Sequence, residues 1–228
     1  MTKGWWRSRI QGIHERSSMD FNFIAGGEAG QGVQSVGFVL AKSMSRGGLY
    51  VFADQDYESR VRGDHNFFRV RVSDSEVQAL SEKIDILIAL NKETIELHQG
   101  KVKGHSITIF DQEKVKIDAE GPSFLNVPLE RLVVETTSNK LMTNSVAMGA
   151  ATGLVKYDFD LLATVLREQF AKTGTEPIEN NVKAARVGYD YARQQAKGRA
   201  GVTLSFCQRG WQYMPTAGIY NLKFFRRG

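Results

Sequence analysis

The chain has 228 residues, of which 42% are hydrophobic and 24% charged, and its one cysteine excludes both an intramolecular disulfide and an iron–sulfur cluster held by this chain alone. No apolar run reaches the ~20 residues of a membrane span, and no apolar signal-peptide core precedes residue 19, so we expect a cytoplasmic protein without membrane contact. The net charge of +5 comes from the chain ends: residues 1–18 carry four cations and one acid, and residues 196–228 carry six cations and no acid. Residues 19–195 therefore have a net charge of −4. This negative charge argues against nucleic-acid binding.

The first predicted elements are a strand, a glycine turn and a helix. The stretch AGGEAGQG at 25–32 follows the apolar run FNFI. After it, Val33, Val36, Leu40 and Met44 recur at the spacing of a helix that ends at RGG, 46–48. Because the first N–H groups of a helix have no intrahelical partner, this turn predicts a site for phosphate or carboxylate. A tight turn without a ligand is the alternative.

The rest of the body alternates strands and helices. Further strands are expected at 49–54, 67–74, 84–90, 105–111 and 124–129. Helices are expected after SDSE (73–76), within 91–103, at 143–154, at 159–170 and from Pro177 onward. In the strand at 67–74, apolar residues alternate with Arg69 and Arg71, which indicates a half-exposed strand.

This order predicts an α/β three-layer α/β/α sandwich with a mostly parallel sheet and a helical C-terminal part. We divide the chain into a basic N-terminal extension (1–18), the folded domain (19–195) and a basic, atypical C-terminal extension (196–228). The small-residue helix TNSVAMGAATGL at 143–154 suits either the core or a docking face.

The glycine turn also matches part of the dinucleotide fingerprint G-x-G-x-x-G/A. Gly30 and Gly32 occupy its first two glycine positions, but Ser35 stands at the third. Asp54, at the end of the second predicted strand, lies roughly where a ribose-binding carboxylate would be. An NAD(P)- or flavin-binding oxidoreductase is therefore one open alternative.

A second candidate binding segment is the polar loop ESRVRGDHN, 58–66. Two guanidiniums, Arg60 and Arg62, beside a glycine suit bidentate capture of a phosphate or carboxylate. The alternative is a solvated loop whose arginines pair with neighbouring acids. His98 is expected at the surface. No two histidines fall at a metal-ligand spacing, so no metal site is expected.

Together, GGEAGQGVQSVG and DYESRVRGDHNFFRVRVSD resemble the gamma subunit or gamma domain of the 2-oxoacid:ferredoxin (acceptor) oxidoreductases. The 2-oxoglutarate-type chains, in which gamma and alpha domains are fused, are the most similar. The resemblance covers about residues 20–192, including TNSVAMGAATGL and ENNVKAARVGYDYA. Two departures are Ala29, where many members have glycine, and Asp64, where glycine is more usual.

The resemblance implies a reaction shared between subunits. A 2-oxoacid is decarboxylated on thiamine diphosphate with Mg²⁺, electrons pass through Fe–S clusters to ferredoxin, and coenzyme A accepts the acyl group. The thiamine site lies between alpha and beta parts, whereas the gamma part packs against alpha and helps close the coenzyme A side. No alpha domain follows Gln195, so a truncated chain of the fused type is one expectation.

The implied role for this chain is binding, with no catalytic residue and no metal of its own. A non-redox anion-binding or assembly module stays open as a third alternative. The residues expected at the coenzyme A side are Gly27, Gly30, Gln31 and Gly32 in the turn and Arg60, Arg62, His65 and Asn66 in the neighbouring loop.

Overall fold

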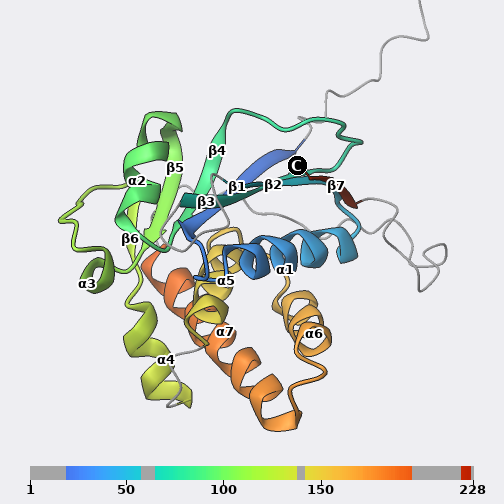
Figure 1. Ribbon diagram of the computed structural model, residues 1–228, viewed down its shortest axis with the longest axis vertical. Coiled ribbons are helices and arrows are strands. Elements are labelled where there is room, and N and C mark those ends of the chain that lie inside the picture. Colours follow the sequence, from blue (N-terminus) through green and yellow to red (C-terminus); the bar gives the residue numbers. More distant parts are fainter. Residues whose placement is uncertain (1–18, 58–64, 138–141, 197–221, 227–228) are drawn as a thin grey trace, which may run out of the picture.

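The centre of the molecule is a single mixed β-sheet (Figure 1). The computed structural model describes residues 19–57, 65–137 and 142–196, together with the backbone of 222–226. In this part of the chain the strand order is β6-β5-β4-β1-β3-β2-β7. The strands are β1 (Asp20–Glu28), β2 (Tyr50–Tyr57), β3 (His65–Ser73), β4 (Ile84–Ala89), β5 (Val102–Phe110), β6 (Phe124–Asn126) and β7 (Leu222–Arg226).

The sheet is mostly parallel, with one antiparallel strand. β3 runs antiparallel to both of its neighbours, β1 and β2, and the other paired strands are parallel. Phe68, Val70 and Val72 of β3 are buried, while Arg69 and Arg71 are half-buried. This alternation confirms the half-exposed strand expected from the sequence, because an antiparallel strand can leave one face partly open to water.

The helices cover the two faces of the sheet unequally. One face carries α1 (Val33–Arg46), α4 (Leu129–Thr137), α5 (Thr143–Leu154), α6 (Phe159–Gln169) and α7 (Thr175–Gln195), drawn below the sheet in Figure 1. Against the other face, the described residues place α2 (Lys92–His98), which continues into the short helix η1 (Gln99–Lys101). A further one-turn helix, α3 (Gln112–Val115), follows β5. The predicted fold class is confirmed, with a thin third layer.

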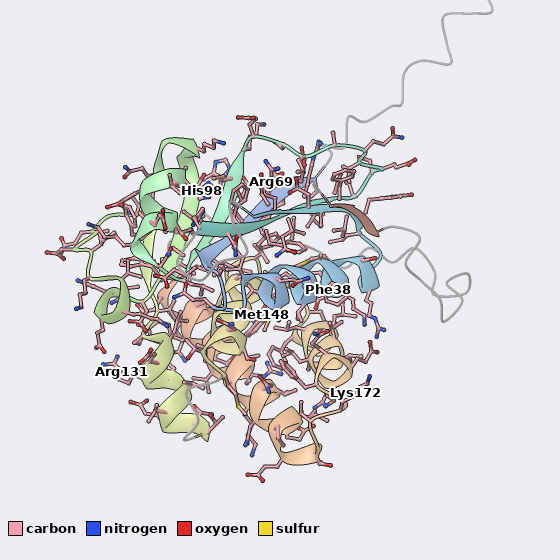
Figure 2. All side chains as sticks on the ribbon, in the orientation of Figure 1. Phe38, Arg69, His98, Arg131, Met148 and Lys172 are labelled. Atoms are coloured by element: carbon pink, nitrogen blue, oxygen red, sulfur yellow. The ribbon has the colours of Figure 1, made fainter. Side chains whose placement is uncertain are left out.

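The apolar core follows the alternation of the strands. Phe23 and Ala25 of β1 belong to the large cluster shared with the helical layer, whereas Ile24 lies in a smaller cluster on the opposite face. Figure 2 shows the same division, with Phe38 and Met148 on the helical side of the sheet and Arg69 and His98 on the other.

The small-residue helix α5 is a core element. All of its residues from Ser145 to Leu154 are buried, and it packs along α7. A Cβ placed on Gly149 would overlap the carbonyl oxygen of Ala185, and one placed on Gly188 would overlap that of Val146. The glycines and alanines of α5 therefore serve close helix–helix packing inside this chain.

Several boundaries differ from the sequence-based expectation. β1 continues to Glu28, β2 continues to Tyr57 and β3 begins at His65, so residues 55–57 and 65–66 are strand, outside the strand bounds expected from the sequence. No helix follows SDSE, whereas α4, which was not predicted, does form. Residues 222–226, inside the segment assigned as an extension, pair with β2 as strand β7. In the described residues, no helix is long and apolar enough to cross a membrane.

Candidate functional site

The turn between β1 and α1 depends on two glycines with positive φ. Gly30 has φ 96° and Gly32, the N-cap of α1, has φ 80°. The Gln31 amide donates to the Glu28 carbonyl at 3.0 Å, and the Gln31 side-chain oxygen accepts from the Glu28 amide at 2.7 Å. Among the described residues, no side chain caps the first turn of α1. No N-cap side chain therefore competes with a ligand for the N-terminal amides of α1.

Asn144, at the start of α5, fixes the turn from the other side. Its Nδ2 donates to the Gln31 carbonyl at 2.8 Å. A Cβ on Gly32 would overlap this same Nδ2 atom. Glycine is therefore required at position 32 both because φ is positive and because α5 approaches closely. This approach brings the N-termini of α1 and α5 together.

A cleft of about 230 Å³ opens beside this turn, at the carboxyl ends of the parallel strands. Crevices at this edge are the usual ligand sites of open α/β sheets. The cleft is lined by the turn, by the residues that follow β4 and β5, and by the first residues of α4 and α5: Gly30, Gln31, Gly32, Ala89, Leu90, Asp111, Lys114, Val115, Leu129, Glu130, Thr143 and Asn144. Three residues predicted for the site, Gly30, Gln31 and Gly32, therefore line it.

Some charged side chains of the cleft walls already contact neighbouring groups of the chain. Asp111 is buried, and its two carboxylate oxygens accept from the amides of Glu113 at 3.1 Å and Glu130 at 3.2 Å. This carboxylate therefore caps the starts of α3 and α4. Lys114 Nζ lies 3.6 Å from a carboxylate oxygen of Glu130, and both side chains are exposed. An exposed pair of this kind exchanges partners easily, so the Lys114 ammonium is available to an anion in the cleft.

The other predicted site residues lie next to the cleft or outside the described residues. Gly27 is part of β1, where a Cβ would meet Leu90 Cβ at 3.0 Å, so it lies behind the turn. His65 and Asn66 are buried strand residues of β3, paired with Glu28 and Gly27, and do not line the cleft. Arg60 and Arg62 fall outside the described residues. The strands on either side of this segment pair with one another, Tyr57 with Asn66, and Asn66 also pairs with Gly27 of β1.

His65 meets a residue that the sequence placed at the surface. His98, on α2, is buried, and its Nε2 lies 3.3 Å from that of His65. Burial, followed by the neighbouring His65 and the cations Lys101 and Arg69, lowers the pKa of His98 to about 4. The expectation of an exposed His98 was wrong. The signal was the spacing of His98 from Thr94 and Ile95, which puts all three on one helical face.

This histidine pair does not amount to a metal centre. The described part of the chain contains no group of three His, Cys, Asp or Glu side chains placed to hold a metal ion. Zinc sites in proteins use at least three protein ligands. The contact instead links α2 to the start of β3.

The geometry of Asp54 does not favour the dinucleotide alternative. Asp54 is buried and forms a bidentate ion pair with Arg69, with N···O distances of 2.8 and 2.6 Å. β2, which carries Asp54, is separated from β1 by the antiparallel strand β3. In a dinucleotide fold the ribose-binding acid ends the strand beside the glycine turn. Here neither the strand order nor the carboxylate meets that requirement.

Comparison with known proteins decides the family. Residues 22–191 match the family model of POR, described as pyruvate ferredoxin/flavodoxin oxidoreductase. The chain belongs to this family. Among relatives, this POR chain is 26% identical over 179 residues to the 2-oxoglutarate synthase subunit KorC of Archaeoglobus fulgidus, covering 78% of the chain and 91% of KorC.

A second relative is much longer than this POR chain. A 2-oxoacid:ferredoxin oxidoreductase subunit alpha from Sulfolobus sp is 31% identical over 103 residues, which covers 44% of the chain and only 16% of that subunit. The chain therefore spans a small part of the alpha subunits that it matches, in agreement with its similarity to a gamma-type domain.

Solved structures support the fold of this POR chain. The 2-oxoglutarate:ferredoxin oxidoreductase from Magnetococcus marinus, with 2-oxoglutarate, coenzyme A and succinyl-CoA bound, has a TM-score of 0.71 at 23% identity, covering 83% of this chain and 33% of that one. A keto/oxoacid ferredoxin oxidoreductase gamma subunit from Geobacter sulfurreducens has a TM-score of 0.62 at 21% identity, covering 75% and 98%.

Proposed function

We propose that this POR-family chain is the gamma-type component of a multi-subunit 2-oxoacid:ferredoxin (acceptor) oxidoreductase, where it packs against the alpha subunit and forms part of the coenzyme A side of the site. The observation that carries the proposal is the open cleft beside the glycine turn, where the N-termini of α1 and α5 meet at the carboxyl edge of the sheet. The solved oxidoreductase from Magnetococcus marinus that shares this fold holds coenzyme A.

The size of the cleft supports a shared site. Pockets that enclose a drug-sized ligand usually have about 300–1,000 Å³, and this cleft has about 230 Å³. It accommodates part of a ligand as long as coenzyme A, such as a phosphate-bearing portion. The remainder would have to be covered by another subunit.

The expected energies lead to the same conclusion. A helix N-terminus contributes roughly 0.3–1 kcal/mol to a bound anion, and up to about 2 when partly buried. One charge-assisted hydrogen bond adds about 1.5–3 kcal/mol. The sum of roughly 2–5 kcal/mol corresponds to millimolar affinity or weaker. The isolated chain should therefore bind coenzyme A feebly, and the complex should bind it well.

The cofactors of the reaction are proposed to reside on partner subunits. Thiamine diphosphate supplies the carbanion-stabilising chemistry of decarboxylation, and Fe–S clusters carry the electrons to ferredoxin. The residues of this chain would orient a phosphate group of coenzyme A and, with the alpha subunit, exclude water from the acyl acceptor. Partners are thus the alpha and beta subunits and, through the complex, ferredoxin, and the expected location is the cytoplasm.

The direct test is Arg62→Ala in the complex reconstituted with alpha and beta subunits. Loss of a phosphate-binding guanidinium should raise the KM for coenzyme A about tenfold or more with little change in kcat, because a charge-assisted contact is worth more than 1.4 kcal/mol. Arg193→Ala, on the exposed surface of α7, is the matched control and should leave the KM unchanged. If Arg62→Ala changes neither the KM nor assembly, the assignment of this loop is wrong.

A further inference from the structure

A second hollow lies between α4, α6 and α7, in the helical layer. It is a groove of about 400 Å³. Its floor is apolar and comes from buried side chains, among them Phe159, Ala163 and Val182. α5 and α7 pack directly on one another, so the groove lies beside the helix pair at the centre of the layer. Figure 1 shows α4 and α6 on opposite sides of α7. We call this hollow the α7 groove.

The walls of the α7 groove are basic. Arg167, Lys183 and Arg186 line it, with Asp160 as the one acid among its lining residues. Arg167 is paired with Glu179 at 3.0 Å, across α6 and α7. Within the part of the chain that the structure describes, Lys183 and Arg186 form no ion pair within 4.0 Å, and both are exposed. Lys183 still lies near the Glu179 carboxyl, whose pKa is lowered first by its hydrogen bond to Arg167 and also by the Lys183 charge.

Arg186 is held in place although no carboxylate of the described residues forms an ion pair with it. Its guanidinium carbon lies 3.7 Å from the centroid of the Phe159 ring, a cation–π geometry. Stacking on a buried ring limits the rotamers of the side chain, so less entropy is lost when the guanidinium binds a carboxylate. Lys183, one turn earlier on α7, extends the positive charge along the same helix face.

The positive charge of the groove is opposite in sign to that of the domain around it, since residues 19–195 have a net charge of −4. The chain's own ends do not complement the groove, because residues 1–18 carry four cations with one acid and residues 196–228 carry six cations with no acid. An apolar floor between basic walls suits a polypeptide that presents carboxylates beside apolar side chains.

We propose that the α7 groove docks an acidic, amphipathic segment of a partner subunit of the oxidoreductase. This inference rests on the proposed function for the identity of the partner. The carboxylates of that segment would pair with Lys183 and Arg186, and its apolar side chains would lie over the apolar floor beside Arg186, at Ala163 and Val182. The interaction is separate from the coenzyme A cleft, because the groove and the cleft share no lining residue.

The experiment uses the full chain and candidate alpha and beta subunits from the same genome, with affinity measured by surface plasmon resonance. Lys183→Glu should weaken the complex about tenfold at low salt, mainly through a slower association rate, because reversing a rim charge acts on electrostatic steering. The difference should shrink as salt is raised to about 0.5 M. Lys83→Glu, an equal charge change at an exposed position outside the groove, should bind as the wild type does.

The outcomes separate the two proposals. If the complex forms and Lys183→Glu binds as tightly as the Lys83→Glu control, the docking proposal is overturned while the proposed function stands. If the wild-type chain instead self-associates through this face and Lys183→Glu abolishes that, the occupant is a second copy and the proposal is also wrong. If no complex forms with any candidate subunit, both proposals fall. Thermal unfolding of each variant checks that the fold is intact.

Discussion

Gly32 satisfies two requirements that alanine does not meet. Its φ of 80° strains any residue with a Cβ by roughly 1–2 kcal/mol. A Cβ would also displace Asn144 and break its hydrogen bond to Gln31, which is worth about 1 kcal/mol. We therefore expect Gly32→Ala to lower the free energy of unfolding by about 2–3 kcal/mol, as measured by urea denaturation.

Gly30→Ala is the matched control for this prediction. Gly30 also has positive φ, at 96°, but a Cβ there meets no atom of the described structure within 4 Å. It should show the backbone strain without the lost hydrogen bond, and so cost about 1 kcal/mol less than Gly32→Ala. Equal costs for the two variants would show that Asn144 does not hold the turn.

His98 makes stability depend on pH. Its pKa in the folded protein is lowered to about 4 from the ordinary 6.5, chiefly by burial. The unfolded chain therefore takes up this proton at a higher pH than the folded protein, and the stability present above pH 6.5 is lost as pH falls towards 4. The expected slope approaches 1.4 kcal/mol per pH unit within this window.

Urea denaturation between pH 7 and pH 5 measures this effect before most carboxylates titrate. His98→Gln should flatten the slope, because it removes the group whose pKa differs between the two states. His105→Gln, at a side chain that is 67% exposed, is the control for replacing a histidine by glutamine. A wild-type slope in His98→Gln would contradict the assignment.

The residues of the candidate site could be predicted where their role is local. Glycines between an apolar run and a helical pattern predicted the turn at Gly30 and Gly32, and the structure places both on the cleft. The contact of His65 with His98 could not be predicted in the same way, because it joins positions 33 residues apart in different elements. The expected roles of Arg60 and Arg62 stay predictions, since both lie outside the described residues.

At the scale of the elements, α5 and α7 pack too closely to admit one further methyl group. Gly149→Ala places a Cβ against the backbone carbonyl of Ala185, which side-chain rotation does not relieve. Overpacking of this kind costs typically 1–3 kcal/mol, more than the ~1 kcal/mol that alanine gains over glycine in a helix. We expect the thermal midpoint to fall by several degrees, since about 1 kcal/mol corresponds to roughly 2–4 °C at this chain length.

Gly100→Ala is the control for the helix pair. A Cβ at Gly100, in η1, meets no atom of the described residues within 4 Å, and its φ is not positive. Its thermal midpoint should stay close to that of the wild type. A Gly149→Ala variant as stable as this control would mean that the two helices separate readily.

The elements that were predicted correctly are those whose hydrophobic pattern lies within the element itself. The aliphatic run of β4 and the three-and-four spacing of α6 do not depend on the rest of the chain. α4 was missed because LERLVVETT contains four β-branched residues, which lower helix propensity. Its helical form is stabilised by packing on α5 and α7, which the local sequence does not reveal.

For the whole molecule, the alternation of strands and helices was sufficient to predict the layers, the mostly parallel sheet and the helical C-terminal part. It was not sufficient to predict the edge of the sheet. Residues 222–226 show no recognisable period, yet they pair with β2 in parallel as β7. A strand at a sheet edge needs only a backbone partner, so its sequence carries a weak signal.

The whole-molecule claim is that this POR chain completes the coenzyme A side of a larger enzyme. The most direct test is the 2-oxoacid-dependent reduction of ferredoxin by alpha and beta subunits, followed over a range of coenzyme A concentrations with and without the full chain. We expect the chain to co-purify with these subunits and to lower the KM for coenzyme A or restore turnover. The same rate and the same KM in its absence would contradict it.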